Sequence, residues 1–517
     1  MKLGVAISLG LAAWAMPAAA EWQKVESDHF VIYADDRPED VRKFAEMLER
    51  YHDAMEFVVG FKGEKPSPSN RVTVYSMGKA SDIQQLSGWG SKYLQGFYIP
   101  RAAGSVAFVP DMRSTRGEPD AALTTLLHEY THHYLISSQR TGMPRWVSEG
   151  AAEFYASAVF LPDGGVNLGK PNVKRGYELF NADKVSIEEL LDEGLYAKRT
   201  SKRYDSFYGR SWLLYHYLMF SPERKGQIST YLRAYGSGAA PLEAARTAFG
   251  DLAALDKDLE KYLRNRRWLM YSVPAERLSP GNIAVSALSE GHAKMMPVIV
   301  RSRRGVDEKT AKEVLAEARA AAASYTTDGA VQAALAEAEF DAGNDAEAIA
   351  AADRAIAANP KIENAYVQKG YALFRQAKDA SDQTAAYAKA MGPFTRLNRM
   401  EPDHPLPLIY LYRSFVERGM EPSETARHAL EKASVVAPFD LGLTFQVGTM
   451  LAKEGKIALA RDFLQPVASS PHGGRMAQVA RTMITQLDGK PEGTPVSLAA
   501  IVVPDVQVDE GGDAPAS

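Results

Sequence analysis

The sequence predicts an α+β domain followed by an all-α solenoid of helical repeats. Residues 21–274 mix short β-branched runs with stretches of helical periodicity, whereas residues 308–487 are Ala-rich and helical almost throughout. In this second part, prolines follow helical segments at separations of 42, 36 and 33 residues (Pro360, Pro402, Pro438 and Pro471). These separations are close to the roughly 34-residue period of a helix-turn-helix solenoid. The chain of 517 residues is long enough for about three folding units.

The composition excludes several classes of protein. With 60 basic and 64 acidic residues, the formal net charge is -4, so there is no overall basic field to attract nucleic acid, and we expect no nucleic-acid partner. The chain has no cysteine, which excludes disulfides, thiolate metal ligands and cysteine nucleophiles. Any metal must therefore be bound by His, Asp or Glu.

The first twenty residues are typical of a secretory signal peptide. A positive start at Lys2 precedes an apolar run, which ends in the small residues Ala18, Ala19 and Ala20. We therefore expect residues 1–20 to be removed and the mature protein to be periplasmic or secreted, with no membrane span after cleavage. The alternative is an uncleaved anchor helix, although the apolar run is shorter than the roughly 20 residues that span a bilayer.

The first half begins with three expected strands, at residues 29–33, 71–75 and 105–109, and a helix over residues 38–59. Residues 105–109 precede the helix that carries the main motif. This strand is either an edge strand that pairs with an extended substrate or an interior strand of the sheet.

The motif with the clearest chemistry is His128-Glu129-Tyr-Thr-His132, within a helix predicted from residue 120 onward. The i, i+4 spacing places both imidazoles on one helix face, where they can share one Zn²⁺, with Glu129 beside the metal. A second helix that begins after Pro144 is expected to bring Glu149 to the metal, which completes a His₂Glu set and leaves a position for water. One turn later, Glu153 is placed to accept the outer N–H of a ligand imidazole.

Both helices resemble those of the gluzincin metallopeptidases, which share an HExxH helix and a W-x-x-E-G-x-A-E helix. More narrowly, residues 22–270 look like the peptidase-MA-like group of bacterial exported proteins. The resemblance implies a zincin-like domain with one zinc ion per chain on His128, His132 and Glu149. It also implies that Glu129 is the general base of peptide-bond hydrolysis.

Stabilisation of the oxyanion usually needs a further hydrogen-bond donor. The candidates are Tyr208, which we favour, and Tyr204, in a helix about 60 residues after the third ligand, as in aminopeptidase-type gluzincins. The alternative for Tyr208 is a core aromatic that packs with Trp212. His133 is turned by about 100° from the ligand face and is expected to be a packed or surface residue.

The second half resembles tetratricopeptide repeats, most clearly in the repeat that ends at Pro360; the alternative is a generic Ala-rich helical bundle. We expect residues 275–307 to be a junction and residues 488–517 to be a disordered tail. Repeats of this kind commonly present a concave surface, so a protein partner is expected.

The main functional hypothesis is an exported zinc peptidase whose repeats recruit a peptide or protein substrate or a partner. The alternative is a periplasmic repeat scaffold with an inactive or structural peptidase-like domain. A third possibility, a zinc hydrolase of another class, shares the same metal chemistry. The sequence leaves the substrate, the choice between endo- and exopeptidase and the oligomeric state open.

Overall fold

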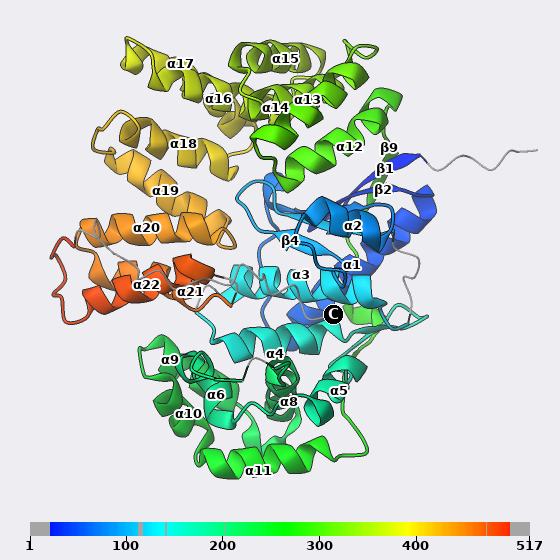
Figure 1. Ribbon diagram of the computed structural model, residues 1–517, viewed down its shortest axis with the longest axis vertical. Coiled ribbons are helices and arrows are strands. Elements are labelled where there is room, and N and C mark those ends of the chain that lie inside the picture. Colours follow the sequence, from blue (N-terminus) through cyan, green and yellow to red (C-terminus); the bar gives the residue numbers. More distant parts are fainter. Residues whose placement is uncertain (1–20, 112–116, 140–141, 202, 472, 497–517) are drawn as a thin grey trace, which may run out of the picture.

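The computed structural model describes residues 21–496 except 112–116, 140–141, 202 and 472 (Figure 1). The expected signal peptide, residues 1–20, and residues 497–517 of the expected tail lie outside the described residues. The described chain consists of an N-terminal α/β region followed by a region of helical repeats. No helix of the described residues is long and apolar enough to cross a membrane.

A six-stranded mixed sheet forms the centre of the N-terminal half, in the order β4-β5-β3-β2-β1-β9. Its strands are β1 (Trp22–Glu26), β2 (Phe30–Asp35), β3 (Val72–Ser76), β4 (Phe97–Ile99), β5 (Val106–Val109) and β9 (Ala284–Ala287). β2, β3 and β5 are parallel, whereas β1, β4 and β9 are antiparallel to their neighbours. Every residue of β5 is buried, because β5 pairs with β3 on one side and β4 on the other. Of the two alternatives for this strand, the interior one therefore holds, and β4 is the edge strand.

Helices cover this sheet and extend below it (Figure 1). They are α1 (Pro38–Val59), α2 (Ala80–Ser87), α3 (Ala121–Gln139), α4 (Arg145–Ala156), α5 (Val173–Asn181), α6 (Ile187–Leu191), α7 (Glu193–Tyr196), α8 (Phe207–Phe220), α9 (Gln227–Gly236), α10 (Pro241–Phe249) and α11 (Leu252–Leu263). A small antiparallel sheet contains β6 (Val159–Phe160), β7 (Val166–Leu168) and β8 (Tyr271–Val273). Short 3-10 turns are η1 (Pro68–Asn70), η2 (Pro222–Arg224) and η3 (Ala275–Arg277).

Two helices, α3 and α4, carry the sequence motifs. α3 begins after Asp120, whose Oδ1 accepts the backbone N–H of Leu123 at 2.9 Å, as an N-cap residue does. α4 begins after Pro144, and from Trp146 to Ala156 every residue is buried. Since α4 packs between α3 and α8, its polar side chains can face only the interior.

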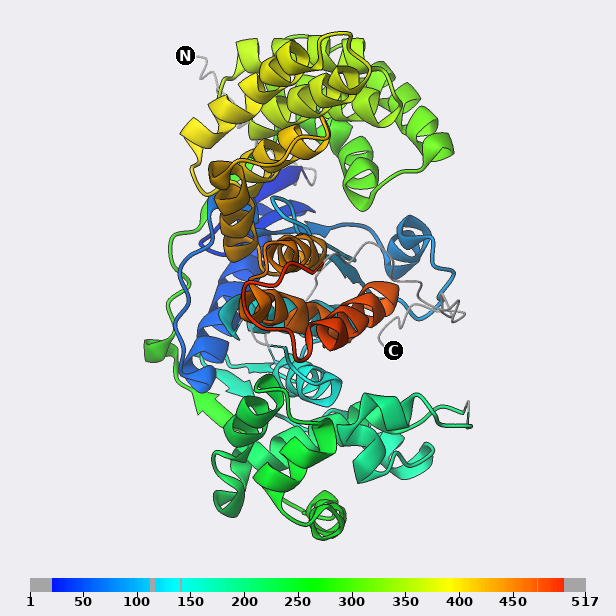
Figure 2. The same cartoon turned by 90° about the vertical axis from the view of Figure 1, so that its left-hand side faces the viewer.

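The second half consists of consecutive packed helices that form a curved stack (Figure 2). They are α12 (Glu290–Arg304), α13 (Glu308–Ala322), α14 (Gly329–Asp341), α15 (Asp345–Ala358), α16 (Glu363–Lys378), α17 (Gln383–Met400), α18 (Pro405–Val416), α19 (Glu424–Val436), α20 (Leu441–Lys453), α21 (Ile457–Ala468) and α22 (Gly474–Leu487). Each of the four regularly spaced prolines follows the second helix of a packed pair, because proline cannot continue the helix there.

The segment 275–307, expected to be a junction, forms part of each half. Residues 284–287 are strand β9, which pairs with β1 of the N-terminal sheet. Residues 290–304 are α12, which packs on α13 and α14. Residues 488–496 of the expected tail also make specific contacts, since the N–H of Val496 donates to the carbonyl of Ala452 at 2.9 Å.

The repeat region turns back against the N-terminal half, so that α21 and α22 lie beside α3 and α4 (Figure 1). At this contact, Asp440 Oδ2 accepts the N–H of Ala102 at 2.9 Å. The Phe439 ring lies 4.5 Å from that of His133, on α3. One side of the helix that carries the HExxH motif therefore packs directly against the repeats.

Candidate metal centre

His128 and His132 from α3 and Glu149 from α4 meet in the interior. The Nε2 atoms of the two imidazoles are 3.2 Å apart, and Glu149 Oε2 lies 3.3 Å from His128 Nε2 and 3.6 Å from His132 Nε2. Ligand atoms bound to zinc at about 2.0–2.1 Å with tetrahedral angles lie about 3.3 Å from one another. The three side chains therefore already have the spacing of one tetrahedral face, and all three are at most 6% exposed.

The outer nitrogen of each imidazole also has a partner. His128 Nδ1 lies 3.3 Å from Glu153 Oε1, and His132 Nδ1 lies 3.0 Å from the Ser148 hydroxyl. Burial alone lowers the pKa of His128, yet hydrogen bonding and negative charge from Glu149 and Glu153 raise it to about 10. The cluster therefore strongly favours a positive charge at this point, which either a proton or a metal cation supplies.

Behind Glu153 lies a buried ion-pair network. Arg175, on α5, pairs with Glu153 at 2.6 Å and with Glu178 at 2.8 Å. Burial tends to raise the pKa of Glu153, but Arg175 and His128 lower it to about 2. Glu178 also accepts a hydrogen bond from the Tyr204 hydroxyl at 2.9 Å.

Sequence reasoning did not identify Ser148, Arg175 or Glu178. The nearest signal was the i, i+3 spacing of Arg175 and Glu178, which is common on solvated helices and gives no indication of burial.

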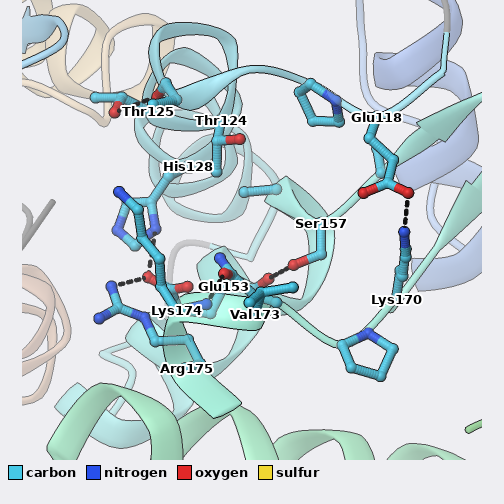
Figure 3. Close-up of a pocket in the computed structure, with 16 residues that line it drawn as sticks. Glu118, Thr124, Thr125, His128, Glu153, Ser157, Lys170, Val173, Lys174 and Arg175 are labelled. Atoms are coloured by element: carbon cyan, nitrogen blue, oxygen red, sulfur yellow. Dashed lines mark hydrogen bonds and ion pairs between the residues drawn. The ribbon is translucent and has the colours of Figure 1, made fainter. Parts of the chain in front are cut away.

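A cleft of about 250 Å³ opens beside this centre (Figure 3). His128, Glu153 and Arg175 lie along one side of the view, and the ion pair of Glu118 and Lys170 lies on the other. The cleft gives an extended ligand access to the face of His128.

The remaining predicted residues lie in different surroundings. Glu129 follows His128 on α3 and is half-buried. Tyr208, also half-buried, begins α8 and lies against Arg175, whose guanidinium carbon is 4.8 Å from the ring centre. Tyr204 is 54% exposed. His133 is buried and packed as expected, with Nδ1 2.7 Å from the Tyr98 hydroxyl, and burial lowers its pKa to about 3.

Gly150, next to Glu149, allows α4 to approach α8 closely. A Cβ atom there would lie 2.5 Å from the backbone oxygen of Ser211. We expect Gly150→Ala to lower the free energy of unfolding by about 1–3 kcal/mol in urea denaturation, because the two helices must move apart. The matched control is Gly176→Ala on α5, where an added Cβ meets nothing within 4 Å. There we expect a gain of about 0.5–1 kcal/mol from helix propensity, and equal effects of the two substitutions would contradict the close approach.

Comparison with known proteins gives a partial match. Residues 122–243 match a family described as "Protein of unknown function (DUF1570)". This segment runs from α3 into α10 and contains the whole metal cluster, Arg175 and both candidate tyrosines. The chain has no match among curated proteins.

Two solved structures are among those similar to this chain. The first is TTC0263, a thermophilic TPR protein of Thermus thermophilus, at 13% identity and TM-score 0.29, which covers 35% of this chain and 91% of its own. The second is MamA, from residue 41 to its end, of Desulfovibrio magneticus RS-1, at 16% identity and TM-score 0.28, with 38% and 98% covered.

Proposed function

We propose that this protein is a zinc-dependent peptidase with one catalytic zinc ion held by His128, His132 and Glu149. The observation that carries the proposal is the spacing of the three ligand atoms, 3.2 to 3.6 Å, which fits a tetrahedral zinc site. The orientation of both imidazoles supports it, because each outer nitrogen faces an acceptor and each Nε2 faces the cluster.

The roles of the residues follow from their positions. When bound, zinc supplies a Lewis acid and lowers the pKa of a coordinated water to about 7. Glu129 accepts a proton from the attacking water and transfers it to the leaving amine. Glu153 and Ser148 hold the imidazoles in the tautomer that leaves Nε2 for the metal, and Arg175 keeps Glu153 ionised. Tyr208 donates a hydrogen bond to the developing oxyanion.

We further propose that the protein is exported and that its helical repeats recruit the substrate or a partner protein. The packing of the repeats against α3 supports a role close to the cleft, since Phe439 contacts His133 on the same helix as the two histidine ligands. The alternative, a repeat scaffold with an inactive peptidase-like domain, predicts no cleavage by the zinc-loaded protein.

Cleavage profiling tests the proposed activity. The mature, zinc-loaded protein is incubated with an unbiased peptide library, and the products are identified by mass spectrometry. Cuts made by the wild type and absent from Glu129→Gln support the peptidase and give its side-chain preference and its endo or exo mode. Absence of cuts, with one zinc per chain verified, favours the scaffold.

The choice between the two tyrosines is tested by a pair of substitutions. We expect Tyr208→Phe to lower kcat about 10²-fold with little change in KM, because the hydroxyl acts only on the developing oxyanion. Tyr204→Phe should change kcat by a few-fold at most, because its hydroxyl binds Glu178 instead. Steady-state kinetics on one cleaved peptide checks both, and a larger effect at Tyr204 would reverse the assignment.

A further inference from the structure

A second cluster of metal-ligand side chains lies in the repeat region, where three helices meet. Glu363 is the first residue of α16, Glu401 follows the end of α17, and His404 precedes α18. One donor atom from each lies within 4.8 Å of the others. Glu401 is 6% exposed and His404 is 2% exposed, so this is an interior cluster rather than a surface one.

The two carboxylates carry charge that the described residues do not balance. Glu401 Oε1 accepts hydrogen bonds from the Ser69 N–H at 3.1 Å and the Ser69 hydroxyl at 2.7 Å. Glu401 Oε2 is buried and has no hydrogen-bond partner within the described part of the chain. Neither Glu363 nor Glu401 forms an ion pair with any described Lys or Arg, although burial of a carboxylate is costly without a compensating charge.

We propose that Glu363, Glu401 and His404 bind a second divalent metal ion of the zinc class. One imidazole and two carboxylates are a donor set that such ions accept, with water in the remaining positions. Ser69 orients the Glu401 carboxylate, as partners outside the ligand shell commonly do. This proposal does not depend on the peptidase hypothesis, because the cluster shares no residue with the first centre.

The surroundings of His404 indicate moderate affinity. The Leu406 N–H points at His404 Nδ1 at 3.3 Å and caps α18. This contact places the proton of the neutral ring on Nε2. Binding at Nδ1 displaces the cap, whereas binding at Nε2 moves the proton to Nδ1 and breaks the same contact. The second ion is therefore expected to leave during dialysis before the first.

The position of the cluster gives the ion a structural role. Ser69 lies in η1 of the N-terminal half, whereas the three ligands belong to the junctions of α16, α17 and α18. A bound ion would therefore lock the middle of the repeat stack to the N-terminal half. Zinc should raise the Tm even when the first centre is destroyed.

The test measures zinc per chain in the full mature protein after equilibrium dialysis and elemental analysis. In the background His128→Ala with His132→Ala, we expect one zinc per chain and a zinc-dependent rise in Tm. Adding Glu363→Gln or Glu401→Gln should reduce this to none and abolish the rise. The matched control is Glu424→Gln, at the exposed first residue of α19, which should retain one zinc.

Two results would overturn the proposal. One is a folded background variant, verified by circular dichroism, that binds no zinc. The other is zinc retained at one per chain after both glutamine substitutions. If the background variant does not fold, the wild type is compared with Glu363→Gln, where two zinc ions against one support the site and equal numbers reject it. Cleavage activity enters neither readout, so failure of this site and failure of the peptidase hypothesis are distinguished.

Discussion

Glu129→Gln is expected to abolish peptide cleavage while the protein keeps one zinc ion at the first centre. The substitution removes the group that accepts the water proton, and a general base contributes about 10²- to 10⁴-fold to the rate. It leaves His128, His132 and Glu149 unchanged, and the amide has nearly the shape of the carboxylate. The measurements are kcat/KM on a peptide cleaved by the wild type and zinc content by elemental analysis.

Glu118→Gln is the matched control for Glu129→Gln. Glu118 also lines the cleft, but it pairs with Lys170 on the side away from His128 (Figure 3). We expect near-normal cleavage and one zinc ion. Loss of zinc in Glu129→Gln would assign this residue to metal binding, and full activity would remove it from the mechanism.

Arg175→Met is expected to have the largest effect on stability. The substitution leaves Glu153 and Glu178 buried without their cation, and removal of one partner from a buried ion pair typically costs about 3–5 kcal/mol. Zinc affinity should also fall about 10- to 100-fold, because Glu153 no longer holds His128 in place. Urea denaturation of the apo protein and competition with a zinc chelator measure these two effects separately.

Two further substitutions test the explanation for Arg175. Lys174→Met removes a neighbouring cation that is exposed, so we expect a change within about 0.5 kcal/mol. Arg175→Lys keeps the charge but not the planar fork that reaches both glutamates, and it should lie between the wild type and Arg175→Met. Equal stability of Arg175→Met and the wild type would show that the network does not stabilise the fold.

The parts of the structure that were predictable depend on local spacing. The i, i+4 separation of His128 and His132 determines their common face on any helix, and a second helix after Pro144 was enough to bring Glu149 near them. The regularly spaced prolines likewise indicated the helix pairs, because each proline ends a helix.

The parts that were missed depend on contacts between distant segments. Arg175 is one of many arginines in the sequence, and only the packing of α5 places it behind Glu153. The ligands Glu363, Glu401 and His404 come from three helices whose sequences carry no metal-binding motif. β9 lies in a segment with little strand periodicity, and its pairing with β1 is determined by the free edge that β1 offers rather than by its own residues.

The pairing of β9 with β1 also affects how the chain can be divided. A fragment that ends at residue 274 lacks β9, and β1 then presents a row of unpaired N–H and C=O groups at the edge of the sheet. Exposed edges of this kind promote aggregation between copies. Since Val25 pairs with Val285, the sheet is completed only after a very long loop has closed, which slows folding. The natural cutting point for an isolated N-terminal half therefore lies after Ala287, in the turn before α12.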